Sequence, residues 1–168
     1  MWRMVASADR EAKLCLLGVM LVKFATGMAA IWGTCNIYFF SYFTHQGIEV
    51  TAQTNSLILL CALIPTSCAV LLSNPFARLL GYRVAVRICA FLFLLSPLVI
   101  NWYCTVASFA FFWLVIPLSC FCLGAMPVLN CLWSHFRRDL SKVSGLAVVA
   151  FSLGMIFWNL LFLFLANP

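Results

Sequence analysis

The chain has 168 residues, of which 65% are apolar and 8% charged, with a mean hydropathy of +1.09 and a formal net charge of +6. A soluble domain of this size cannot bury so much apolar surface, whereas lipid solvates apolar side chains and forces backbone groups to pair within each helix. The composition therefore excludes a soluble globular protein and indicates an all-α integral membrane protein with several transmembrane helices.

Five apolar segments are long enough to cross a membrane. A helix rises about 1.5 Å per residue, so a hydrocarbon core of roughly 30 Å takes about 20 residues. The apolar stretch that follows residue 84 is too long for one helix, and the polar string Asn-Trp-Tyr-Cys-Thr at residues 101–105 predicts a turn within it. The predicted spans, which form one transmembrane domain over residues 1–168, are residues 14–43, 56–72, 84–100, 106–132 and 143–165.

Basic residues predict the orientation of these spans. Lys and Arg cluster before the first span, around the link between the second and third, and after the fourth, while the loops at residues 44–55 and 101–105 contain none. By the positive-inside rule the amino terminus is cytoplasmic, or on the matrix side of a mitochondrial membrane, and five crossings place Pro168 on the opposite side. We therefore attribute the net charge of +6 to the orientation of the chain in the membrane and to contact with anionic lipid, and not to nucleic-acid binding.

Polar residues within the spans are candidates for function or for contacts between helices. Lys23 is the one charged residue well inside a span. Its side chain either snorkels to the cytoplasmic boundary, which we favour, or binds a substrate or coupling ion. Three asparagines either form interhelical hydrogen bonds, the role we favour, or bind a ligand: Asn36, Asn130 and Asn159.

Small residues and prolines predict how the helices pack. Ala25, Ala29 and Gly33 recur at four-residue steps in the first span, and a weaker stripe in the fifth span includes Ala150 and Gly154. Such stripes let two helices approach closely, although small residues also line substrate cavities. Prolines predict kinks in the second, third and fourth spans, at positions 65, 97, 117 and 127.

The sequence offers little enzyme chemistry. Its acidic residues lie at or outside the ends of the spans, and no carboxylate pair, phosphate-binding glycine loop or metal-ligand spacing occurs. Nine cysteines are scattered without a Cys-x-x-Cys pair, and we expect free, buried thiols that act as small apolar residues. We therefore expect no enzyme activity, no catalytic residue, no metal and no cofactor.

The link between the second and third spans resembles a signature of major facilitator superfamily transporters. Residues 74–83 read Asn-Pro-Phe-Ala-Arg-Leu-Leu-Gly-Tyr-Arg, similar to the family's Gly-x-x-x-Asp-Arg-x-Gly-Arg loop, with Gly81 and the basic residue Arg83 in common. In the family, the acidic residue of this loop helps to latch the two halves of the transporter together, and the resemblance therefore implies that this latch is absent or altered here. The positions at which the family's Gly, Asp and Arg are replaced are Asn74, Arg78 and Leu79.

Two further stretches carry the same resemblance. Pro127, Trp133, the pair Arg137 and Arg138, and the Ser-Gly-Leu-Ala of residues 144–147 are similar to the second basic link of monocarboxylate and oxalate/formate-type facilitators. In the first span, Trp-Gly at residues 32–33 and Asn-Ile-Tyr at residues 36–38 are similar to their first helix. The resemblance covers nearly the whole chain.

The resemblance implies a bundle of five transmembrane helices like an incomplete six-helix half of a twelve-helix transporter. It further implies transport of small organic solutes, such as monocarboxylates, by a partial chain in which Lys23, Asn36, Tyr38 and Asn130 face the substrate path. The alternative is a non-transporting structural subunit of a larger membrane complex derived from such a transporter. The expected partners are the lipid bilayer, a small carboxylate, and further copies of the chain or other membrane subunits; nucleic acid is not expected.

Overall fold

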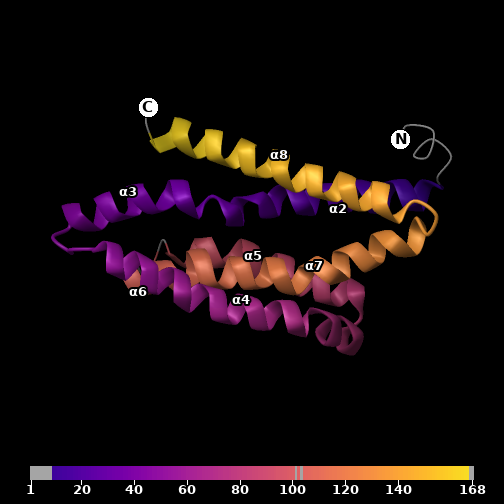
Figure 1. Ribbon diagram of the computed structural model, residues 1–168, viewed down its shortest axis with the longest axis horizontal. Coiled ribbons are helices and arrows are strands. Elements are labelled where there is room, and N and C mark those ends of the chain that lie inside the picture. Colours follow the sequence, from indigo (N-terminus) through magenta and orange to yellow (C-terminus); the bar gives the residue numbers. More distant parts are fainter. Residues whose placement is uncertain (1–8, 101, 103, 167–168) are drawn as a thin grey trace. The chain divides into compact units, whose positions relative to one another are not determined.

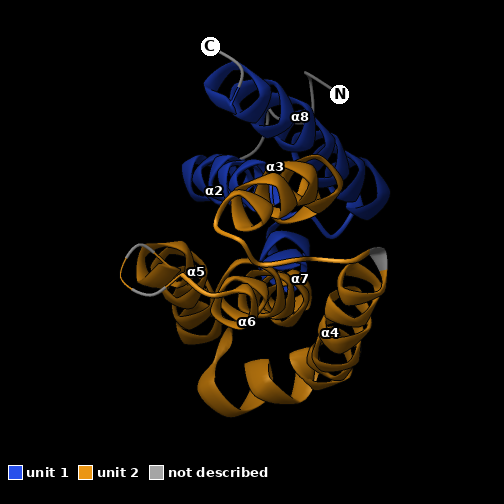
Figure 2. Cartoon of the chain, turned by 90° about the vertical axis from the view of Figure 1, so that its left-hand side faces the viewer, with its two compact units in different colours: residues 1–28, 128–168 blue, residues 29–127 orange. Residues whose placement is uncertain are grey.

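The computed structural model describes residues 9–100, 102 and 104–166, and all the regular secondary structure in them is helical (Figure 1). The chain divides into two compact units, unit 1 with residues 1–28 and 128–168 and unit 2 with residues 29–127 (Figure 2). Two short segments interrupt the α-helices: the 3-10 segment η1 (Gly27–Ala30) and the π-helical segment η2 (Ala110–Val115). The α-helices are α2 (Arg10–Thr26), α3 (Trp32–His45), α4 (Ala52–Leu80), α5 (Tyr82–Ile100), α6 (Val106–Phe109), α7 (Ile116–His135) and α8 (Leu140–Ala166).

Within the described residues, five helical stretches are long and apolar enough to cross a membrane, which confirms the number of spans predicted from the sequence. Many large apolar side chains of these stretches are exposed. Leu79, for example, is 85% exposed and Phe164 is 75% exposed. Lipid accommodates such a surface and water does not, so these helices indicate an integral, multi-pass membrane protein. The stretches are Arg10–Ala30, Gln53–Leu80, Tyr82–Ile100, Val106–His135 and Leu140–Ala166.

The observed helix ends agree with the predicted spans at some positions and differ at others. α5 ends at Ile100 and α6 begins at Val106, at the predicted positions, and Thr105 caps α6 by accepting a hydrogen bond from the Ser108 amide at 3.1 Å. Of the predicted turn between them, residues 101 and 103 lie outside the described residues. The single helix predicted over residues 14–43 is instead interrupted by η1, and α4 runs to Leu80, eight residues beyond its predicted end.

Two serine hydroxyls donate hydrogen bonds to backbone carbonyl groups that have lost their usual helical donor, because proline has no N–H. Pro127 has no N–H to donate to the carbonyl of Leu123, four residues earlier. The fully buried Ser73 of α4 donates to that carbonyl at 2.7 Å, so this hydrogen bond holds the end of α4 against α7. In α5, Ser96 donates to the Phe93 carbonyl at 3.1 Å, which Pro97 leaves without its usual donor.

Removing the Ser73 hydroxyl is expected to destabilise unit 2 more when residue 127 is proline than when it is alanine. Ser73→Ala leaves the Leu123 carbonyl buried without a donor, at a cost of about 0.6–1.7 kcal/mol by analogy with interhelical hydrogen bonds in other membrane proteins. Pro127→Ala restores an N–H at position 127, so Ser73→Ala should cost less in that background. A double-mutant cycle of thermal unfolding in detergent measures the difference, and equal costs in both backgrounds would contradict this explanation.

In unit 1, α2 and α8 lie side by side and run in the same direction (Figure 1). The backbone at Gly27, the residue that directly follows α2, touches the backbone of α8 at Gly154. A Cβ added at Gly27 would lie 2.6 Å from the Met155 nitrogen, and one added at Gly154 would lie 2.8 Å from the Phe24 carbonyl carbon. The Trp158 indole N–H also donates to the Phe24 carbonyl at 3.2 Å. Only glycine fits at this contact, which fixes the two helices together.

The prediction that the small-residue stripe of the first span forms the close contact with another helix is wrong. Ala25 and Gly33 are exposed, and the close approach is made by Gly27, which the stripe does not include. The stripe assumed one continuous helix, whereas the 3-10 turns of η1 break its register within this stretch. In α8 three small residues of the predicted stripe are buried, Ala147, Ala150 and Gly154, whereas Gly145 at its start is exposed.

None of the nine cysteines forms a disulfide, but their burial differs from the expected pattern. Cys61, Cys68 and Cys104 are exposed, so the expectation of buried thiols is wrong for them. Cys61 and Cys68 lie on the apolar α4, where lipid in place of protein can surround a weakly polar thiol. The three buried thiols are Cys35, Cys89 and Cys120.

Candidate functional site

Five aromatic side chains, here named the aromatic cluster, gather in unit 2. The cluster is centred on Phe109 of α6, whose ring centroid lies 3.5 Å from that of Phe39 and 6.4 Å from that of Phe43. Two indole rings complete the cluster, since Trp32 of α3 and Trp113 of η2 each stack on Phe109 at a centroid distance of 5.9 Å. Phe109 is 2% exposed, so the cluster forms a tightly packed apolar core.

Both helical stretches that supply this cluster are irregular next to it. Pro117 has no N–H to donate to the carbonyl of Trp113, and residues 110–115 widen into the π-helical turns of η2. In the first span, η1 ends at Ala30 and α3 begins at Trp32, so the ordinary helical hydrogen bonding is interrupted just before the cluster. Broken helices and π-helical turns are frequent at functional sites of membrane proteins. The aromatic cluster is therefore the candidate site.

Polar atoms without partners lie beside these aromatic rings. Trp32 is 8% exposed and its indole Nε1 has no acceptor, and Asn36, one turn further along the same face of α3, has a buried Oδ1 without a donor. Burying a polar atom without a hydrogen bond costs about 1–3 kcal/mol by measurements on proteins. A donor and an acceptor on one helix face are thus buried without a hydrogen-bond partner. Across the described residues, buried side-chain atoms of this kind all belong to unit 2: Trp32 Nε1, Asn36 Oδ1, Asn55 Oδ1 and Ser119 Oγ.

The four substrate-binding residues predicted from the sequence are divided between the two units. Asn36 and Tyr38 lie in unit 2, but two residues along a helix turn the side chain by about 200°, so these two project to different sides of α3. Lys23 and Asn130 lie in unit 1 and are both half-buried. Lys23 is in the last turn of α2, roughly 20 Å along the helix from Arg10.

Sequence reasoning noted Trp32 only as part of a family resemblance and missed it as a ligand-binding candidate. The signal that could have singled it out is its place one helical turn before Asn36 in an apolar span. The absence of an acceptor for its N–H becomes visible only once the neighbouring helices are placed around it.

The link between α4 and α5 is shorter than the sequence signature predicts. Most of residues 74–83 is helical, and Gly81 alone joins the two helices, with φ 82° and ψ 144°. Residues with a Cβ rarely adopt this conformation, which explains the glycine at this position. Arg78 lies in the last turn of α4 and Arg83 near the start of α5, and both are exposed.

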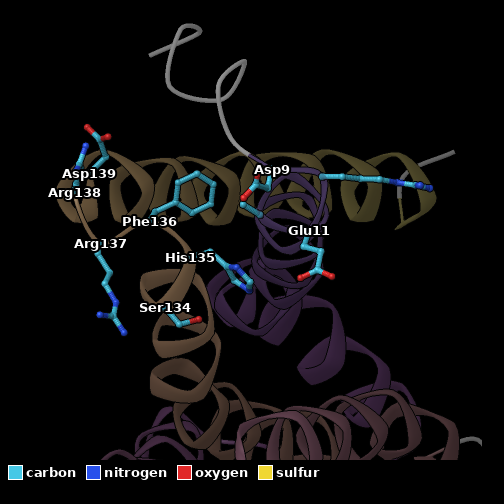
Figure 3. Close-up of a pocket in the computed structure, with 10 residues that line it drawn as sticks. Asp9, Glu11, Ser134, His135, Phe136, Arg137, Arg138 and Asp139 are labelled. Atoms are coloured by element: carbon cyan, nitrogen blue, oxygen red, sulfur yellow. The ribbon is translucent and has the colours of Figure 1, made fainter.

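The second basic link lines a pocket of about 750 Å³ in unit 1, between the start of α2 and the turn from α7 to α8. Figure 3 shows the His135 side chain directed toward α2, whereas the Arg137 side chain points away from α2. The Asp139 carboxylate forms an ion pair with Lys142 at 2.6 Å. The lining contains three arginines and three carboxylates, a balance that does not favour an anionic substrate: Asp9, Arg10, Glu11, Ala12, Ser134, His135, Phe136, Arg137, Arg138 and Asp139.

Two further findings concern the chemistry and the kinship of the chain. Among the described residues, no group of three or more His, Cys, Asp or Glu side chains is placed to hold a metal ion. Comparisons of the chain with protein families, with curated proteins and with solved structures find no match.

Proposed function

We propose that the chain is part of a membrane transporter for small organic solutes, monocarboxylates among them. The observation that supports this most is the pair of buried atoms on α3, Trp32 Nε1 and Asn36 Oδ1, which lack hydrogen-bond partners. An apolar, aromatic surrounding with a few polar groups is typical of sites for small molecules. An indole N–H can donate to a carboxylate oxygen, and an amide can both donate and accept.

The interruption of the first span favours transport over a purely structural role for these atoms. Substrate sites of many transporters are formed by transmembrane helices that are broken near the middle of the bilayer. Here η1 interrupts the first span immediately before Trp32, and η2 interrupts the fourth span at Trp113. In this proposal, the residues that the family resemblance implies for the substrate path keep that role: Lys23, Asn36, Tyr38 and Asn130.

A second candidate is a structural subunit derived from such a transporter. It is favoured by the replacement of the family's acidic latch residue by Arg78 and of the following arginine by Leu79. In that case, the unpartnered atoms of Trp32 and Asn36 would form hydrogen bonds with a neighbouring membrane protein. The two candidates therefore differ in what satisfies the same two atoms.

Trp32→Phe separates a ligand-binding role from a packing role. Phenylalanine keeps an aromatic ring in the cluster but removes the unpartnered N–H, so we expect thermal stability to be unchanged or raised. If the N–H binds a carboxylate, losing a hydrogen bond to a charged group costs about 1.5–3 kcal/mol, which corresponds to a loss of roughly ten- to a hundred-fold in affinity. Binding and uptake of labelled monocarboxylates by the chain in liposomes would measure this.

Trp113→Phe is the matched control, because Trp113 belongs to the same cluster and its Nε1 is not among the buried atoms without partners. We expect this variant to retain carboxylate binding. Equal binding by Trp32→Phe and the wild-type chain would contradict the assignment of Trp32. Failure of the wild-type chain to bind or take up any solute of a broad panel of organic acids, together with copurification with other membrane subunits, would favour the structural role.

A further inference from the structure

Two thiols from different helices meet in unit 1. The Sγ atoms of Cys15 on α2 and Cys131 on α7 are 3.7 Å apart, although 116 positions separate the residues in sequence. Both side chains are half-buried. Such an approach is not required by composition or by helical periodicity, because the two residues belong to the first and fourth spans.

Both thiols lie near buried residues of their own helices. On α2, Ala12 and Leu16 are buried on either side of Cys15 in the sequence, and on α7 the adjacent Leu132 is fully buried. A disulfide has an S–S distance of about 2.05 Å, so the two sulfur atoms must approach each other by roughly 1.7 Å. Side-chain rotations and small adjustments of two helices can supply this displacement.

The thiol pair lies close to the polar end of its helices. Cys15 is five residues after Arg10 at the start of α2, and Cys131 is four residues before His135 at the end of α7. These separations correspond to about 6–8 Å along the helices. Arg10 and His135 both line the pocket of unit 1, which therefore lies at this end of the two helices.

We propose that Cys15 and Cys131 form a reversible disulfide, and that this redox modification ties α2 to the end of α7. Hydrogen peroxide serves as the oxidant. One thiolate attacks a peroxide oxygen, the O–O bond breaks, and a sulfenic acid forms as hydroxide leaves and takes up a proton to give water. The second thiolate attacks the sulfenic sulfur, the S–S bond forms, the S–O bond breaks, and hydroxide leaves and is protonated.

In the overall reaction, two thiols and one molecule of hydrogen peroxide give one disulfide and two molecules of water. Two molecules of glutathione restore both thiols by exchange and become glutathione disulfide. The disulfide restrains movement of α2 against the end of α7, near the pocket of unit 1. This inference depends on the position of two sulfur atoms and stands independently of the proposed transport of solutes.

The test uses the whole chain in membrane vesicles treated with hydrogen peroxide, followed by alkylation of the remaining thiols and proteolysis. We expect mass spectrometry to find a peptide that links Cys15 to Cys131, and we expect a non-reducing gel to show faster migration that glutathione reverses. Cys15→Ser and Cys131→Ser should each abolish both signals. The matched controls Cys61→Ser and Cys68→Ser, which change exposed thiols of α4, should retain them.

Gel filtration of each variant shows whether it keeps the wild-type elution, so that loss of the link is not mistaken for misfolding. A second variant, in which Cys15 and Cys131 are the only cysteines, should form the same link at the wild-type rate. Alkylation of both thiols after peroxide treatment of the wild-type chain would overturn the proposal. So would a link from either residue to a different cysteine.

Discussion

Replacing Gly154 with alanine is expected to separate α2 from α8 and to destabilise unit 1. The new Cβ would lie 2.8 Å from the Phe24 carbonyl carbon and 2.9 Å from the Phe24 Cα, and these backbone atoms cannot rotate away. Overpacking typically costs 1–3 kcal/mol in protein cores, about the same as or more than one hydrogen bond. We expect a lower temperature of unfolding in detergent and a smaller fraction of chain that elutes as a single species.

Gly145→Ala provides the matched control within the same helix. A Cβ at Gly145 meets no atom within 4 Å, and alanine favours a helix interior by about 1 kcal/mol relative to glycine. The control should therefore be neutral or stabilising. Equal losses of stability in Gly154→Ala and Gly145→Ala would show that the contact between α2 and α8 is not the cause.

The largest loss of stability is expected from Phe109→Ala. The Phe109 ring lies at the centre of the aromatic cluster and touches rings from α3 and η2. Helices in a bilayer gain little from excluding water and are held mainly by packing, so an empty space at the centre of the cluster removes attraction that lipid does not replace. Truncation of a buried phenylalanine to alanine costs about 3–5 kcal/mol in soluble proteins, and a loss approaching that range is expected here.

Phe111→Ala distinguishes the loss of the cluster from the loss of any aromatic ring. Phe111 lies two residues later, in η2, and is 51% exposed. Its removal should change the unfolding temperature little, because lipid can fill the space that the ring occupied. A similar loss of stability in Phe109→Ala and Phe111→Ala would contradict the central role given to Phe109.

The number of spans and several of their ends could be predicted because hydropathy and length directly determine them. The polar string after Ile100 and the capping residue Thr105 mark where α5 ends and α6 begins. The end of α4 was missed because it depends on a tertiary contact. The apolar stretch predicts an end at residue 72, but the hydrogen bond from Ser73 to the Leu123 carbonyl holds this part of α4 against α7.

The features of the candidate site could be predicted less well from the sequence. Neither a proline nor a charged residue marks the interruption of the first span at Gly27–Ala30, so the sequence predicts a continuous helix there. Asn36 was identified because an intramembrane amide is conspicuous, whereas the role assigned to Trp32 depends on which acceptors surround its indole. The approach of Cys15 to Cys131 is a contact between distant spans that no local pattern predicts.

The most direct test of the account is to map which side of the membrane each end of the chain faces. Glycosylation acceptor sites can be placed before residue 1, in the loop at residues 46–51 and after Pro168, and the chain can be inserted into microsomes. Five crossings with a cytoplasmic amino terminus predict that the loop and the carboxyl-terminal site are glycosylated and that the amino-terminal site is not. Modification of both terminal sites, or of neither, in chains whose loop site is modified would contradict five crossings.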